Sequence, residues 1–166
     1  ITADTLQEAG VVNLADIAQL VPTLTVSTNL SPFATGIRIR GIGTSQNNIA
    51  LEASVAFVVD GVYLGRSGLG MSDLTDIERV EVLQGPQGTL YGKNANAGVI
   101  SVVTKNPDFD ETGGYVQATA GDYGLQQYTA SLTGPVNDEF AYLLAGNWRQ
   151  QDGWLENDSG PDQMSE

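Results

Sequence analysis

Hydrophobic residues recur along this chain with two different periods, and the change between them falls near residue 112. In the first part the clearest pattern is helical, because Leu14, Ile17 and Val21 recur at the spacing that places them on one face of a helix. Asn13 is a good N-terminal cap, and Pro22 cannot continue the backbone hydrogen bonding. The pattern therefore predicts a helix that begins after Asn13 and ends at Pro22.

The rest of the first part has the pattern of short strands. Five segments alternate or are continuously apolar, namely residues 37–40, 55–59, 62–64, 77–83 and 98–104. Asp60 and Gly61 separate the second segment from the third, and an Asp-Gly pair between such runs is a strong hairpin signal. The Gly-rich link 85–93 predicts a turn followed by one helical turn. We therefore expect an α+β unit, a small mixed sheet of four or five strands with short helices.

After residue 112 the period becomes two, over longer segments. We expect strands at residues 115–120, 125–133 and 140–149, joined by turns at 121–124 and 134–138. Apolar side chains gather on one face of these strands, which would carry Val116, Ala118, Ala120, Tyr128, Ala130, Leu132, Phe140, Tyr142, Leu144 and Trp148.

Two interpretations fit these longer strands. A strand of about 10 residues with one apolar face, tilted near 45°, has the length of a transmembrane β-strand. An ordinary antiparallel sheet that covers a water-soluble core has the same alternation. A closed membrane barrel needs at least about eight strands. On the membrane interpretation, this chain is therefore part of a much larger barrel protein, in which residues 113–166 supply about three strands.

Composition removes several classes of function. The net charge is −13, which argues against nucleic acid as a partner because binding phosphates requires clustered Lys and Arg. The chain has no Cys and no His, so it lacks the usual zinc ligands and the Cys-His and Ser-His-Asp catalytic groups. We expect no catalytic residues, no metal site and no cofactor, and the chain is not predicted to be an enzyme.

Charged motifs favour structural roles. Glu78 and Glu81 flank Arg79, and a salt bridge explains this spacing better than an acid/base pair. Acidic clusters around residues 108–111 and 152–162 are compatible with Ca²⁺, but neither has the spacing of an EF-hand loop. Solvated acidic loops are the favoured interpretation.

One stretch resembles a known family signature. The succession of strand, Gly-Pro turn, helical turn, Gly-rich corner and strand over residues 77–105 resembles the signature of TonB-dependent outer-membrane receptors. Other motifs fall in the order found in this family, namely Ile39-Arg40-Gly41, Val59-Asp60-Gly61-Val62, and Gly134-Pro135 followed by Phe140-Ala141-Tyr142. The resemblance implies a plug domain over residues 1–112. It also implies the first three strands of a β-barrel of about 22 strands over residues 113–166.

The resemblance also implies a function and partners. Such receptors lie in the outer membrane of Gram-negative bacteria and take up scarce ligands, usually ferric siderophores, haem, cobalamin or sugars. Uptake is energised by TonB, which binds a TonB-box peptide expected upstream of Ile1, outside this chain, by strand addition. Outer-membrane lipid would contact the apolar face of the barrel strands. The alternative function is a soluble β-rich periplasmic or extracellular binding module.

Site residues follow from the matched motifs. The resemblance implies that Arg40 joins the plug to carboxylates of the barrel wall, with Gln84 and Glu81 at the same plug–barrel lock. It implies ligand contacts from outward loops around residues 27–33, 44–48 and 66–68. The side chains expected to contact the ligand are those of Ser45, Gln46, Asn47, Asn48, Arg66 and Ser67.

Overall fold

The computed structural model describes residues 1–11, 13–27, 35–44, 51–65 and 76–152. The chain divides into two compact units, Ile1–Lys105 and Asn106–Glu166. The sequence pattern predicts the boundary at residue 112. That residue ends the link 105–112 between β7 (Gly98–Thr104) and β8 (Gly113–Ala120).

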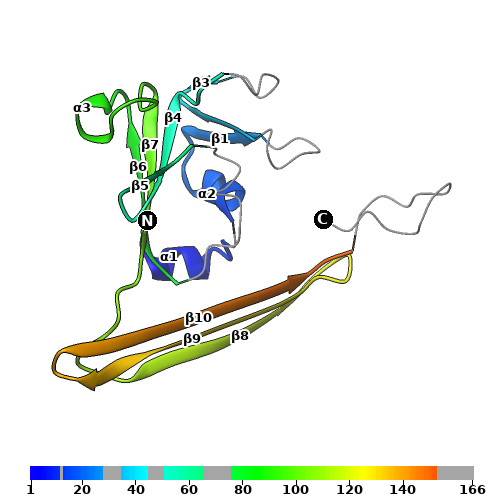
Figure 1. The fold of residues 1–166 in the computed structure, drawn as a ribbon. Helices are drawn as coiled ribbons and strands as arrows, with labels where there is room; N and C mark the ends of the chain where they lie inside the picture. The colour runs from blue at the N-terminus through cyan, green and yellow to red at the C-terminus, as the bar shows by residue number, and fades with distance from the viewer. Residues whose placement is uncertain (12, 28–34, 45–50, 66–75, 153–166) are drawn as a thin grey trace. The chain divides into compact units, whose positions relative to one another are not determined.

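A mixed sheet forms the centre of the first unit (Figure 1). Its strands are β4 (Val55–Val59), β5 (Val62–Leu64), β6 (Ile77–Gln84) and β7 (Gly98–Thr104), in the order β5-β4-β7-β6. β4 and β7 pair in parallel, and the two outer pairs are antiparallel. The Asp60-Gly61 turn joins β4 to β5 with positive φ at both residues, as the hairpin signal predicts. The predicted α+β class with a mixed sheet is confirmed.

A second, smaller sheet was only partly predicted. It contains β1 (Leu24–Ser27), β2 (Gly36–Ile39) and β3 (Ile42–Gly43), paired antiparallel in that order. The described part of the first unit therefore holds seven strands, and the expected four or five is wrong. β1 and β3 were missed because segments this short carry little periodicity and depend on pairing with β2. Arg40 was also expected to end a strand, but it lies in the turn between β2 and β3.

Three helices accompany these sheets in the described residues. They are α1 (Ala3–Glu8), α2 (Leu14–Leu20) and α3 (Gly88–Tyr91), and α1 was not predicted. α2 begins as expected, because the Asn13 side chain accepts hydrogen bonds from the backbone N–H groups of Ala15 and Asp16. The Asp16 carboxylate accepts in return from the Asn13 N–H at 3.1 Å, which completes a capping box. Figure 1 shows α1 and α2 on the same side of the four-stranded sheet.

Buried side chains lie on both faces of the four-stranded sheet. On one face Leu6, Leu14 and Ile17 from the helices pack with Phe57, Ile100 and other sheet residues. On the other face Ala56, Val58 and Val99 pack with Ala95 and the partly buried Tyr91. The central strand β4 is thus covered on both faces, which explains its continuous apolar sequence.

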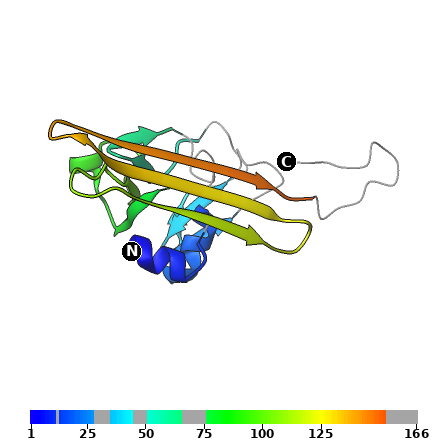
Figure 2. The ribbon, with the colours of Figure 1, turned by 90° about the horizontal axis from the view of Figure 1, so that it is seen from below.

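The second unit is one antiparallel sheet (Figure 2). Its strands are β8 (Gly113–Ala120), β9 (Gln126–Asn137) and β10 (Phe140–Gln150), in the order β10-β9-β8. All three predicted strands are present, but the turn expected at residues 134–138 is wrong because β9 continues to Asn137. Pro135 lies beyond Thr133, the last residue of β9 that pairs with β8, so in this part of β9 only β10 is a neighbour, as Pro in a strand requires.

Candidate functional site

The Ile-Arg-Gly motif forms a tight hairpin turn. Ile39 and Ile42 are paired across it, and the two residues between them have positive φ, 53° at Arg40 and 77° at Gly41. Two-residue hairpins favour this geometry, but its first position suits Asn, Asp or Gly better than Arg. Arg40 therefore occupies an unfavourable backbone conformation while its side chain is exposed. Such outliers concentrate at functional sites.

Thr23 connects Arg40 with Gln84. Its carbonyl accepts a hydrogen bond from the Arg40 backbone N–H at 2.8 Å. Its hydroxyl accepts one from Gln84 Nε2, also at 2.8 Å. Two residues of the predicted lock are thus held to the same residue at the start of β1. Thr23 itself was missed, because a Thr after a helix-ending Pro carries no signal of such a role.

Glu81 has a partner on its own strand. Arg79 Nε donates a hydrogen bond to Glu81 Oε1 at 2.8 Å, and the other side of the guanidinium pairs with Glu78. Hydrogen bonds to Glu81 and Glu78 raise the pKa of Arg79 above its ordinary value. The predicted salt bridges are present, whereas Arg40 forms no ion pair within the described residues.

The predicted ligand-contact side chains lie outside the described residues. This applies to Ser45, Gln46, Asn47, Asn48, Arg66 and Ser67. The residues on either side of the first group are described and lie close together. Thr44 Oγ1 donates to the Glu52 carbonyl at 2.8 Å and also lies 2.8 Å from Ser54 Oγ.

The sheet of the second unit has two chemically different faces. The register places Val116 opposite Ala130, and Leu132 opposite Leu144, on one face. Exposed fractions on this face are 84% at Val116, 45% at Leu132 and 66% at Leu144. Residues on the opposite face are mainly polar, namely Gln117, Thr119, Gln127, Thr129, Ser131, Thr133, Asn147 and Arg149. The face assignments made from the sequence are thus confirmed by the register.

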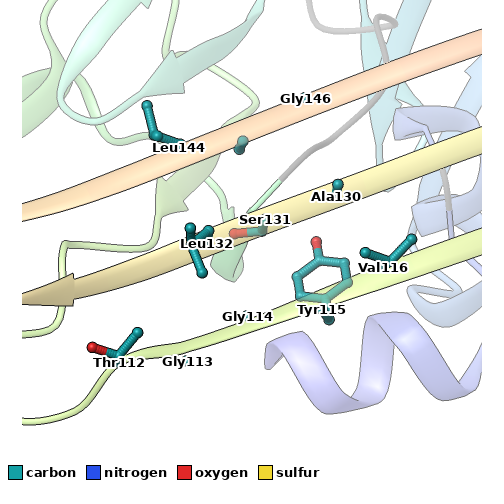
Figure 3. A pocket seen from close by; sticks show the side chains of 11 residues that line it. Thr112, Gly113, Gly114, Tyr115, Val116, Ala130, Ser131, Leu132, Leu144 and Gly146 are labelled. Atoms are coloured by element: carbon teal, nitrogen blue, oxygen red, sulfur yellow. The ribbon is translucent and has the colours of Figure 1, made fainter.

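A shallow hollow lies on the apolar face (Figure 3). Its volume is about 740 Å³. Small residues on adjacent strands, Gly114, Ala130 and Gly146, lie between the larger side chains of Val116, Leu132 and Leu144. Polar groups at its edge come from the hydroxyls of Thr112, Tyr115 and Ser131, and no charged side chain lines it. It is suited to contact with an apolar environment.

Aromatic residues lie near the ends of the same face. The rings of Tyr128 and Trp148 stack, with centroids 5.7 Å apart, at one end of β9 and β10. Phe140 begins β10 at the other end and is 63% exposed. In the described part of the chain, no helix has the length and hydrophobicity needed to cross a bilayer.

Neither acidic cluster forms a metal site in the described residues, where no group of three suitable ligands occurs. The Asp108 carboxylate instead accepts hydrogen bonds from the backbone N–H groups of Asp110 and Glu111. These two bonds lower the pKa of Asp108. Most of the second cluster lies outside the described residues.

Comparison with known proteins identifies the family. The family model described as TonB-dependent Receptor Plug Domain matches residues 1–99. The pesticin receptor of Yersinia enterocolitica is 32% identical over 92% of this chain and 22% of its own length. The vitamin B12 transporter BtuB of Vibrio vulnificus is 31% identical over 93% of this chain and 25% of its own.

A solved structure gives the same result. The ferric yersiniabactin uptake receptor FyuA from Yersinia pestis superposes with a TM-score of 0.85 and 30% identity, over 99% of this chain and 26% of FyuA. The chain belongs to the TonB-dependent receptors, a family of the Gram-negative outer membrane, and contains their plug domain. It spans about a quarter of the length of the relatives it matches.

Proposed function

We propose that this chain is the plug domain and the first three barrel strands of a receptor that imports a scarce ligand across the outer membrane. The plug gates the lumen of the barrel, and TonB supplies the energy through a TonB-box peptide upstream of the plug. The observation that carries the proposal is the exposed apolar face of β8, β9 and β10, which follows a plug domain directly in the chain. In a water-soluble protein such a face would have to be covered by other protein segments.

The dimensions of β10 support contact with lipid. From Phe140 to Trp148 the strand extends about 27 Å at ~3.4 Å per residue. Membrane barrels have an apolar band about 25 Å tall between girdles of aromatic residues, crossed by strands tilted by ~40°. At that tilt the segment rises about 21 Å, so its aromatic ends lie close to the two interfaces of such a band. The polar face then points toward the barrel interior.

Arg40 is proposed as the plug side of an ionic lock with barrel carboxylates. Its guanidinium has no acidic partner among the described residues, and burying such a group in a lumen requires one. Gln84 is uncharged, and its proposed role is to hold Thr23, to which its side-chain amide donates a hydrogen bond. Glu81 contributes the carboxylate oxygen that Arg79 leaves accessible.

The proposed ligand is a ferric siderophore or a complex of similar polarity. FyuA, described as a ferric yersiniabactin uptake receptor, supports this class, whereas BtuB is named for vitamin B12. Ser45, Gln46, Asn47, Asn48, Arg66 and Ser67 are proposed to donate hydrogen bonds to it.

Growth of a deletion strain tests the transport function. The strain is supplied with a panel of ferric siderophores, haem or cobalamin as the limiting nutrient, with and without the full-length gene. We expect the gene to restore growth on one ferric siderophore, and only in a strain that has TonB. Restoration on cobalamin alone would contradict the ligand class, and TonB-independent growth would contradict the mechanism.

A further inference from the structure

Lys93 and Asn94 form a corner between α3 and β7, in the part of the chain that carries the family signature. Asn94 has a left-handed backbone, with φ of 70°, and is 9% exposed. The backbone around it is well fixed, because Ala95 and Ala97 are buried. The Ala95 carbonyl accepts from the Gln87 N–H at 2.8 Å, and the Ala97 N–H donates to the Ser54 carbonyl at 2.9 Å. The corner is therefore a rigid support for its two side chains.

The two side chains reach two different segments. Lys93 Nζ lies 2.9 Å from Glu52 Oε1, in the segment that precedes β4. Asn94 Nδ2 donates to the Tyr63 hydroxyl at 2.7 Å, in β5. Glu52 is in turn bound through its carbonyl to Thr44. One corner thus contacts both the segment that precedes β4 and the strand β5.

Electrostatics favours the charged form of both partners. The hydrogen bond from Lys93, its positive charge and a smaller contribution from Asn94 lower the pKa of Glu52, while Glu52 raises the pKa of Lys93. The ion pair is exposed, with side-chain exposures of 71% for Lys93 and 63% for Glu52. Exposed pairs contribute little to global stability. Its effect is therefore on the local position of the Glu52 segment.

We propose that Lys93 and Asn94 are positioning residues that couple residues 51–54 to residues 62–65, so that a displacement of either segment is transmitted to the other through the corner. This inference rests on the proposed function, since these segments adjoin in sequence the residues proposed to contact the ligand. A bound ligand that shifts one segment would thereby change the other. The rigid corner would pass the change to β7 at the centre of the sheet.

Hydrogen exchange of the full-length receptor in detergent tests this coupling without any ligand. Lys93→Met should speed exchange of the amides in both segments by about two- to fivefold, the range set by the strength of an exposed ion pair. Tyr63→Phe, which removes the hydroxyl but keeps the ring, should also speed exchange at residues 51–54. Lys93→Arg should restore the native rates, and β6 should be unaffected in these three variants.

Arg79→Met is the matched control, because it removes an exposed cation from a different ion pair of the same unit. Effects confined to the segment that each mutated side chain contacts would overturn the coupling. Equal acceleration in the control, or acceleration throughout the sheet, would also overturn it. Because the measurement uses no ligand, its outcome is independent of whether a ferric siderophore proves to be the substrate.

Discussion

Gln84 at the end of β6 donates its side-chain amide to the hydroxyl of Thr23, 61 positions earlier in the chain, at 2.8 Å. The bond joins the four-stranded sheet to the start of the smaller sheet. Thr23 also accepts from the Arg40 backbone. The position of the Ile-Arg-Gly turn is therefore linked to the strand that leads into the Gly-Pro turn.

Removing this link should weaken the plug measurably. Gln84→Ala is expected to lower the free energy of unfolding by about 0.5–1.5 kcal/mol, the usual net value of one hydrogen bond. Urea denaturation of the chain measures the change. Gln19→Ala, at an exposed helix position, is the control and should change it by less than ~0.5 kcal/mol. Equal effects of the two substitutions would show that the Thr23 contact is not stabilising.

The left-handed conformation of Arg40 gives a prediction of opposite sign. Arg40→Asn should raise the free energy of unfolding of this chain by about 1 kcal/mol, because Asn tolerates the turn better than Arg. In the full-length receptor the same substitution should reduce ligand uptake, since it removes the proposed lock. Arg38→Asn is the control, and it should destabilise because Arg38 lies in β2, where Asn is unfavourable. A loss of stability in Arg40→Asn would contradict the interpretation of the turn.

The Asp108 turn should respond to acid. Hydrogen bonds from the Asp110 and Glu111 N–H groups lower the pKa of Asp108, so the folded turn favours the carboxylate. Its contribution to stability is present above the ordinary Asp pKa of ~3.9 and is lost as pH falls through the lower value of the folded state. NMR titration of the Asp108 side-chain carboxyl carbon should show a midpoint below pH ~3.9. In Asp108→Asn the Asp110 and Glu111 amides should lose the part of their pH response that follows this carboxyl, and an Asp108 midpoint above that pH would contradict the assignment.

Local patterns predicted much of the fold, and the missed features include a strand held by a distant partner and a turn whose residues are unusual for it. The α2 helix, the Asp60-Gly61 hairpin and the alternating faces of β8–β10 all depend on residues adjacent in sequence. β1 depends on β2, whose paired residues lie nine to fifteen positions further along the chain, whereas β3 is only two residues long and was missed although β2 adjoins it. The left-handed Arg40 was missed because turn propensities favour other residues at that position.

The candidate site was less predictable than the fold. Nothing near Thr23 in the sequence indicates that it binds both Arg40 and Gln84. Glu78 and Glu81 were correctly paired with Arg79 because all three are neighbours on one strand. Glu52, Lys93 and Asn94 meet across about forty positions, and no spacing rule connects them. The roles of Arg40, Gln84, Glu81 and the ligand-contact residues remain predictions.

Substituting a charged residue on one face of the second unit's sheet or on the other tests which face contacts lipid and which faces the barrel lumen. Leu144→Arg should cost about 2–4 kcal/mol if this side chain faces the middle of a bilayer. Less full-length receptor should then assemble in the outer membrane, measured by heat-modifiable electrophoretic mobility. Ala145→Arg, one residue further along the same strand, points to the opposite face and should assemble normally. Similar losses in both variants would contradict the assignment of the faces.

The environment of the apolar face of β8, β9 and β10 decides whether these strands cross a membrane. Nitroxide labels placed singly at Ser131, Leu132, Leu144 and Ala145 of the full-length receptor in bilayers report this through collisions with oxygen and with a water-soluble nickel chelate. We expect labels at Leu132 and Leu144 to collide with oxygen and not with nickel, and the labels at Ser131 and Ala145 to lack this lipid signature. Nickel access to Leu132 and Leu144 equal to that at their neighbours would contradict the membrane assignment and, with it, the proposed receptor.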